Sequence, residues 1–292
     1  MKKRNKKVSQ LASLPVRQLE PANRPMVRQA HHPSDHPERS RGAGQPANDS
    51  LRLGRPLSLR DVENHYCAGC GHGIVHRLVC EAIDEFGIRD RVIAVAPVGC
   101  AVIAYEYWDF DVTEAAHGRT PAVATGIKRV RPHNIVFTYQ GDGDLAAIGT
   151  AEIIHTANRG ENITVIFVNN GVYGMTGGQM APTTLAGQKT STTLTGRSIR
   201  RDGYPIKMLE MLAVLPGAKY LERVSVHSAQ ETLRAKRAIT KAFKMQIDNK
   251  GFSMVEVLSM CPTYWGMTPL QAADRIKNEV STFYPLGVIK SC

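Results

Sequence analysis

The sequence predicts an α/β protein with a doubly wound, mainly parallel sheet and helices on both faces. Two patterns support this prediction. Short runs of apolar, β-branched residues alternate with segments whose apolar residues recur at helical spacing, and polar turns directly follow two of the apolar runs. Strands that are apolar throughout are typical of parallel sheets, because both faces of such a sheet are covered. We therefore expect strand and helix to alternate along the chain.

The elements are expected in a definite order. Apolar residues between 74 and 86 predict a helix, which is followed by a strand over 91–97. The next expected elements are a helix over 122–130, a strand over 134–139, a helix over 145–158 and a strand over 163–168. Helices over 207–215 and 231–247, with a last buried strand over 252–258, complete the pattern.

The chain divides into a basic extension, residues 1–57, and one large domain, residues 58–292. The first 60 residues hold 13 Lys/Arg against 4 Asp/Glu, which is most of the formal net charge of +11. They are rich in proline and lack hydrophobic periodicity, so we expect them to be disordered. Because the remaining residues carry an excess of only two positive charges, we expect no nucleic-acid partner.

We recognise no signal for membrane insertion or export in the sequence. No run of 18 or more apolar residues occurs, and no apolar segment of signal-peptide length follows Lys2-Lys3-Arg4. We therefore expect a cytoplasmic protein with no membrane partner.

Two polar turns predict a magnesium-diphosphate site. Gly141-Asp142-Gly143 and Asn169-Asn170 each follow an expected strand, and ligands of parallel sheets bind beyond the carboxyl ends of the strands. A hard cation on a diphosphate prefers a few oxygen ligands. We assign these ligands to the carboxylate of Asp142, the side-chain carbonyl of Asn170 and the backbone carbonyl of Val172. A Gly-Asp-Gly tripeptide alone is often only a turn, but the paired asparagines strengthen the assignment.

Three neighbouring residues are assigned to the diphosphate itself. Gly141 and Gly143 allow the main chain to approach closely, because neither has a side chain. The helix that begins near Asp144 directs its free N–H groups at the anion. We therefore count Gly141, Gly143 and Asp144 as cofactor-binding residues.

The cysteines indicate a second site. Cys67-Ala-Gly-Cys70 is compatible with zinc, with a redox dithiol or with an iron-sulfur cluster. Cys80 lies in an apolar helical pattern and is interpreted as a buried core residue, and the terminal Cys292 as incidental. The wide spacing of the other cysteines argues against a local zinc ribbon.

The sequence resembles the β subunits of 2-oxoacid:ferredoxin oxidoreductases. The runs Gly141-Asp-Gly-Asp-Leu-Ala-Ala-Ile-Gly149 and Asn169-Asn-Gly-Val-Tyr-Gly-Met-Thr-Gly-Gly-Gln179 are similar to the thiamine diphosphate motif of that family, and the similarity extends over residues 66–284. The resemblance implies a thiamine diphosphate-binding fold and a catalytic role for residues 58–292. It also implies that a 4Fe-4S cluster is bound by Cys67, Cys70, Cys100 and Cys261.

The resemblance implies further site residues. It assigns the cofactor contacts to two loops, at Val98, Gly99, Cys100 and Ala101 and at Gly174, Met175 and Thr176. His117 and Arg119 lie in a segment that is near the cofactor in the family. Arg119 would meet the substrate carboxylate by a bidentate contact. As an alternative, His117 caps the following helix and Arg119 faces solvent.

The activity implied by the resemblance is oxidative decarboxylation of a 2-oxoacid to acyl-CoA and CO₂. Electrons would pass singly through the 4Fe-4S cluster to ferredoxin, and coenzyme A would accept the acyl group. No glutamate stands in a recognisable motif to contact the aminopyrimidine ring. The resemblance assigns that carboxylate to a partner α subunit, with γ and δ subunits as candidate further partners of the hetero-oligomer.

The segment Thr176-Gly-Gly-Gln179 bears on the substrate. It offers no cation for the distal carboxylate of 2-oxoglutarate, and an unpaired carboxylate is costly to bury. This favours an apolar 2-oxoacid such as 2-oxoisovalerate or pyruvate. Two other functions remain open: a non-redox thiamine diphosphate-dependent decarboxylase or synthase with structural cysteines, and a zinc-stabilised binding module.

Overall fold

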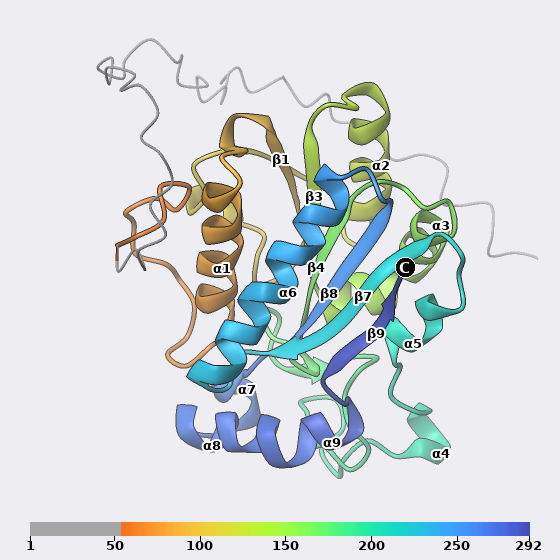
Figure 1. Ribbon diagram of the computed structural model, residues 1–292. Helices are drawn as coiled ribbons and strands as arrows, with labels where there is room; N and C mark the ends of the chain where they lie inside the picture. The colour runs from red at the N-terminus through yellow and green to blue at the C-terminus, as the bar shows by residue number, and fades with distance from the viewer. Residues whose placement is uncertain (1–53) are drawn as a thin grey trace, which may run out of the picture. The chain divides into compact units, whose positions relative to one another are not determined.

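A seven-stranded sheet forms the centre of the residues that the computed structural model describes, 54–292 (Figure 1). Its strand order is β2-β1-β3-β4-β8-β7-β9. All neighbouring strands are parallel except β9, which is antiparallel to β7. The predicted doubly wound, mainly parallel sheet is therefore confirmed. The strands are β1 (Val92–Ala96), β2 (Asp111–Glu114), β3 (Ile135–Gly141), β4 (Thr164–Asn169), β7 (Ala218–Ser225), β8 (Phe252–Leu258) and β9 (Gly287–Ser291).

Helices cover both faces of this sheet. The helices α1 (His72–Glu85) and α6 (Ala229–Ile247) pack on one face and share one apolar cluster with the strands (Figure 1). The opposite face is covered by α2 (Thr120–Val130), α3 (Thr150–Asn158) and α5 (Met208–Ala213), which belong to a second cluster. The strands β3, β4 and β8 are buried almost throughout, as their continuous apolar sequences predict.

Short elements complete the described chain. They include the two-stranded ribbon β5 (Val172–Tyr173) with β6 (Gln179–Met180), and the helices α4 (Ile199–Asp202), α7 (Pro262–Trp265), α8 (Pro269–Arg275) and α9 (Ser281–Phe283). 3₁₀ turns occupy Arg89–Arg91 and Ala104–Glu106, and π-helical turns occupy Asp144–Ile148 and Ile276–Val280. None of the helices described between residues 54 and 292 is long and apolar enough to span a membrane.

The expected elements are present, one of them is divided, and several further elements were not expected. The helix expected over 145–158 is divided at Gly149, where a Cβ would lie 2.8 Å from the carbonyl oxygen of Gly118. Three strands of the main sheet, β2, β7 and β9, were not expected, nor were the ribbon β5–β6 and the short helices α4, α7, α8 and α9. The extension predicted over 1–57 lies outside the described residues, apart from 54–57, so its disorder stays a prediction.

The sheet has a topological switch point between β1 and β3. From β1 the chain crosses to its outer neighbour β2, whereas from β3 it continues to β4 on the other side. The carboxyl ends of β1, β3 and β4 are neighbours at this edge, because these strands are parallel and in contact. Connections that diverge in this way leave a crevice at the strand ends, where ligands of such folds bind.

Candidate functional site

A pocket lies at this switch point and contains most of the predicted site. Its lining comes from the loops after β1, β3 and β4, with contributions from the start of α1 and the loop before α2. Of the residues predicted for the cofactor, the metal or catalysis, eleven line it. The lining residues are His72, Pro97, Val98, Cys100, Ala101, His117, Gly141, Asp142, Gly143, Asp144, Asn170, Val172, Tyr173 and Gly174. The other predicted residues, Gly99, Arg119, Met175, Thr176, Cys67, Cys70 and Cys261, lie outside this lining.

Asp142 is a buried carboxylate that is held by three hydrogen bonds. Its Oδ2 accepts from the Gly171 amide at 2.7 Å and from the Thr183 hydroxyl at 2.6 Å, and its Oδ1 accepts from the Gly143 amide at 2.9 Å. Burial raises the pKa of Asp142 to about 6, although these hydrogen bonds oppose the rise. A bound cation would restore the ionised form. Together with the oxygens of Asn170 and Val172 in the same pocket, this donor set fits Mg²⁺.

The asparagine turn is fixed on two sides. The Asn170 Oδ1 accepts a hydrogen bond from the Val172 amide at 3.2 Å, and its backbone carbonyl accepts from the Trp265 indole at 3.1 Å. These two hydrogen bonds orient the turn.

Asp144 connects three loops through its buried carboxylate. Oδ1 accepts from the His117 Nδ1 at 2.6 Å and the Gly118 amide at 2.9 Å, and Oδ2 accepts from the Gln140 amide group at 2.7 Å. The Val98 amide approaches Oδ1 at 3.4 Å. The carboxylate of Asp144 thus orients His117 toward the pocket, while its backbone begins the π-helical turn after Gly143.

His117 and Arg119 differ in their positions. His117 does not cap α2, because the N-cap residue is Arg119 and no side chain caps that helix. Arg119 does not line the pocket. Its side chain is 52% exposed and forms an ion pair with Glu152 on α3. The contact of Arg119 with a substrate carboxylate stays a prediction.

Glycine is needed for different structural reasons at the two glycine positions of the Gly-Asp-Gly turn. A Cβ on Gly141 would meet nothing within 4 Å, so this position borders open space that a cofactor can occupy. A Cβ on Gly143 would overlap the ring of Tyr173. Gly143 therefore makes room for that ring, in addition to lining the pocket.

The four predicted cluster cysteines come from three segments that lie close together. The Sγ atoms of Cys100 and Cys261 lie 3.0 and 3.8 Å from the place where a Cβ on Gly174 would stand. The Cys70 amide donates to the Cys67 carbonyl at 2.9 Å, which forms a tight turn. A Cβ on Gly71, directly after this turn, would overlap the Ser259 side chain, two residues before Cys261.

Burial disfavours the thiolate form of two of the predicted cluster cysteines, Cys100 and Cys261. All six cysteines of the chain are free, so no disulfide competes for them. Burial, and then the charge of neighbouring thiols, raises the pKa of Cys100 to about 11, and burial raises that of Cys261 to about 12. Iron would compensate this buried negative charge.

The arrangement of these cysteines does not suit a single ion. Across residues 54–292, no group of three or more His, Cys, Asp or Glu side chains is close enough to hold one metal ion. A 4Fe-4S cluster binds each thiolate at a different iron and needs a wider arrangement.

Several residues of the site were not predicted, including Pro97 and Tyr173 of the pocket lining. Thr183 donates to Asp142 from 41 positions away, and no motif marks it. Gln140 holds Asp144, and its place at the end of an expected strand was the only signal. His72 is buried in the pocket wall, and its Nδ1 is 2.8 Å from the Tyr139 hydroxyl.

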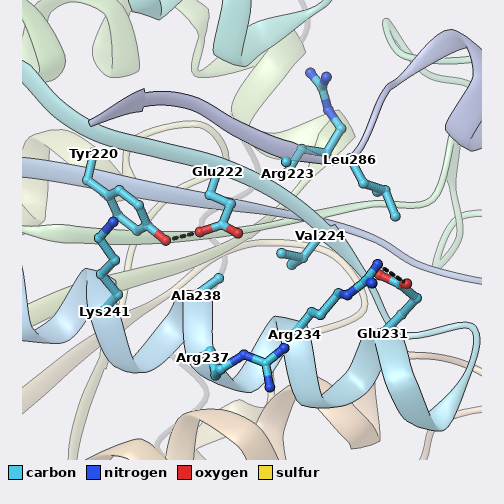
Figure 2. A pocket seen from close by; sticks show the side chains of 11 residues that line it. Tyr220, Glu222, Arg223, Val224, Glu231, Arg234, Arg237, Ala238, Lys241 and Leu286 are labelled. Atoms are coloured by element: carbon cyan, nitrogen blue, oxygen red, sulfur yellow. Dashed lines mark hydrogen bonds and ion pairs between the residues drawn. The ribbon is translucent and has the colours of Figure 1, made fainter.

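A second cleft lies between β7, α6 and the start of β9, and it contains none of the predicted residues (Figure 2). Its charges are largely paired internally. Arg234 forms an ion pair with Glu231 at 2.6 Å, Tyr220 donates to Glu222, and the Lys241 ammonium lies 4.6 Å from the centre of the Tyr220 ring. The candidate site therefore remains the pocket at the switch point.

Comparison with known proteins identifies the family of the domain that contains this pocket. The family model of the C-terminal TPP-binding domain of thiamine pyrophosphate enzymes matches residues 98–257. Ketoisovalerate oxidoreductase subunit VorA of Methanothermobacter thermautotrophicus is 50% identical over 242 residues, which cover 80% of this chain and 51% of that protein. The 2-oxoglutarate synthase subunit KorB of Methanocaldococcus jannaschii is 41% identical over 216 residues, which cover 73% of this chain and 75% of that protein.

A solved structure shares the fold. It is that of 2-oxoglutarate:ferredoxin oxidoreductase from Magnetococcus marinus with 2-oxoglutarate, coenzyme A and succinyl-CoA bound. Its TM-score is 0.64 at 28% identity, over 75% of this chain and 72% of that one. The chain spans about half the length of the VorA relatives, at 51% and 46%. Because the domain, the KorB relative and the fold all match, the chain belongs to the thiamine pyrophosphate-binding β subunits of the 2-oxoacid:ferredoxin oxidoreductase family.

Proposed function

We propose that the chain is the catalytic β subunit of an oxidoreductase that converts a 2-oxoacid and coenzyme A to acyl-CoA and CO₂, with ferredoxin as electron acceptor. One observation supports this above the others. Cys100 lines the cofactor pocket and, with Cys261, lies beside Gly174, whose Cβ position is also 3.9 Å from the Asn170 amide nitrogen. The thiols of Cys100 and Cys261 and the turn that carries Asn170 are therefore neighbours. A non-redox thiamine enzyme has no need of that proximity.

In this proposal, different residues bind the metal, the diphosphate and the iron-sulfur cluster. Asp142, Asn170 and the carbonyl of Val172 bind Mg²⁺, and the open space at Gly141 receives the diphosphate. Thiamine diphosphate, when bound, supplies the ring that stabilises negative charge at the decarboxylated carbon. Cys67, Cys70, Cys100 and Cys261 hold the 4Fe-4S cluster that carries single electrons away.

His117 is the candidate proton carrier of the pocket. Asp144 accepts at Oδ1, so Nδ1 carries the shared proton when Asp144 is ionised. The Nε2 atom then presents a lone pair. We assign His117 to accept at Nε2 the proton that the coenzyme A thiol releases, with Asp144 fixing the tautomer and the ring orientation.

The proposal includes a partner α subunit. Among the described residues, no glutamate lines the pocket, although the aminopyrimidine ring of thiamine requires a carboxylate. The relatives are named as subunits, which fits a hetero-oligomer. The α subunit would supply the missing carboxylate, and γ and δ subunits are candidate further partners.

We assign the substrate to the branched, apolar 2-oxoacids, with 2-oxoisovalerate first. The loop after the asparagine turn has no cation and satisfies its own polar groups. The Thr176 hydroxyl donates to the Gln179 side chain at 2.7 Å, and the Gln179 amide donates back to the Thr176 carbonyl at 2.7 Å. A distal carboxylate would be unpaired there. The two VorA relatives, at 50% and 52% identity, are named for ketoisovalerate.

The test is anaerobic co-expression of the chain with the proposed α subunit. The purified complex is expected to be brown, to contain about four irons per chain and to reduce viologen with coenzyme A and 2-oxoisovalerate. Reduction with 2-oxoglutarate should be much slower. Zinc in place of iron, or decarboxylation without viologen reduction, would overturn the proposal. Faster turnover of 2-oxoglutarate would overturn only the substrate assignment.

A further inference from the structure

A network of buried, hydrogen-bonded side chains lies behind the turn at residues 169–171, and it begins at Arg223 on β7. The Arg223 side chain is fully buried and leaves the strand on the side away from α6 and the cleft (Figure 2). Its Nε donates to the Glu256 Oε2 at 2.8 Å. Its two Nη atoms donate to both carboxylate oxygens of Glu210, at 2.9 and 2.7 Å. Every nitrogen of the guanidinium is therefore occupied by a carboxylate.

This hydrogen-bonded network continues from Glu256 to the carboxylate of Asp142, the proposed metal ligand. The Glu256 Oε1 accepts from the Asn169 side-chain amide at 2.7 Å. The Asn169 Oδ1 in turn lies 3.3 Å from the Gly171 amide, which also donates to the Asp142 Oδ2 at 2.7 Å. Each link is a direct hydrogen bond, so the position of Glu256 determines the orientation of the turn that carries Asn170.

A second route leads from the same arginine to the same oxygen. The Arg223 guanidinium lies 5.3 Å from the centre of the Tyr284 ring. The Tyr284 hydroxyl donates to the Thr183 carbonyl at 2.8 Å, and the Thr183 hydroxyl donates to the Asp142 Oδ2 at 2.6 Å. Both routes therefore end at Oδ2 of Asp142. Holding Oδ2 in place also orients Oδ1, the other oxygen of the carboxylate.

Stability alone does not account for this arrangement. A buried ion pair generally stabilises a fold no better than well-packed apolar side chains of the same size. We propose that Arg223 and Glu256 are positioning residues of the magnesium-diphosphate site, acting through Asn169, Gly171 and Thr183. This inference rests on the proposed function, because it concerns the metal that the proposed reaction requires. Side chains that orient metal ligands typically contribute 10–100-fold to metal affinity.

The test measures metal affinity in the complex with the α subunit, by Mn²⁺ electron paramagnetic resonance with thiamine diphosphate present. Glu256→Gln replaces one carboxylate oxygen by an amide, which cannot accept from both Arg223 and Asn169. We expect Mn²⁺ affinity to fall about 10- to 100-fold, with unchanged iron content. Arg223→Lys should lose less affinity than Arg223→Met, because lysine retains the charge.

The matched control is Ser253→Ala, also on β8 and buried, whose hydroxyl bonds only to Thr164 and to the carbonyl of Ala242. It should retain wild-type Mn²⁺ affinity. In Glu256→Gln, saturating Mg²⁺ should restore kcat while the KM for Mg²⁺ stays raised. If Glu256→Gln does not fold, Tyr284→Phe tests the second route by removing one hydroxyl.

Three outcomes would count against the inference or its premise. Wild-type Mn²⁺ affinity in both Glu256→Gln and Tyr284→Phe would overturn it. A loss of kcat that Mg²⁺ does not restore would also overturn it, because the role would then be structural. A wild-type complex that binds no Mn²⁺ with thiamine diphosphate would instead refute the proposed function.

Discussion

Magnesium binding should depend on pH through Asp142. The pKa of this buried carboxyl is raised from 3.8 to about 6, and Mg²⁺ binds only the ionised form. Protonation therefore competes with the metal below pH 6. The apparent affinity for Mg²⁺ should be about tenfold lower at pH 5 than at pH 8.

The same shift fixes the sign of the stability change. A carboxyl whose pKa is raised on folding destabilises the fold once it ionises. The cost approaches about 3 kcal/mol, from a shift of about two pKa units. The metal-free chain should thus lose stability as the pH rises from about 4 to about 6. Bound Mg²⁺ should suppress that loss, because it stabilises the ionised form.

Thr183→Val separates this effect from protonation of the diphosphate itself. The Thr183 hydroxyl donates to Asp142 at 2.6 Å and lowers its pKa, so its removal should raise the midpoint of the affinity profile by about one pH unit. The assay is calorimetric titration of the complex with Mg²⁺ and thiamine diphosphate between pH 5 and pH 8. The diphosphate protonates identically in both proteins. An equal loss of affinity at every pH, with an unmoved midpoint, would refute the reasoning.

Three further predictions concern single residues. Cys261→Ala should abolish the cluster, measured as iron per chain, whereas the exposed Cys292→Ala should keep full iron content. Gly141→Val should leave the unfolding free energy of the cofactor-free chain nearly unchanged. It should lower the affinity for thiamine diphosphate at least about tenfold, because the valine side chain enters open space that the diphosphate needs. Equal affinity of the variant and the wild type in calorimetry would contradict this. Arg197→Met should lower the unfolding free energy by about 3–5 kcal/mol in urea titrations, because the buried guanidinium donates to six backbone carbonyls, and a loss below about 1 kcal/mol would contradict that role.

The placement of the two proposed metal ligands could be predicted from the sequence because its determinants are local. Asp142 and Asn170 each follow an apolar strand directly, and strands β3 and β4 are parallel neighbours, so both side chains reach the same edge of the sheet. The alternation of apolar strands and helices predicts that arrangement without knowledge of any distant contact. The pocket lining confirms that these residues lie together.

The supporting residues could not be predicted, because their determinants are distant in sequence. Strand β7 contains Lys219, Glu222 and Arg223, which interrupt the apolar pattern that marks the other strands. Arg223 can be buried only because Glu256, 33 positions later, and Glu210, 13 positions earlier, neutralise it. Single-sequence periodicity carries no information about such pairs.

The position of Gly174 links the proposed magnesium site to the proposed cluster site. A side chain there would approach the sulfurs of Cys100 and Cys261 on one side and the Asn170 amide on the other. The absent side chain allows the cluster loops and the magnesium turn to pack against one backbone segment. On the proposed function, a shift of that segment would move a proposed cluster ligand and a proposed metal ligand together. The shared segment would then hold the thiamine site and the cluster at a fixed separation, as single-electron transfer between them would require.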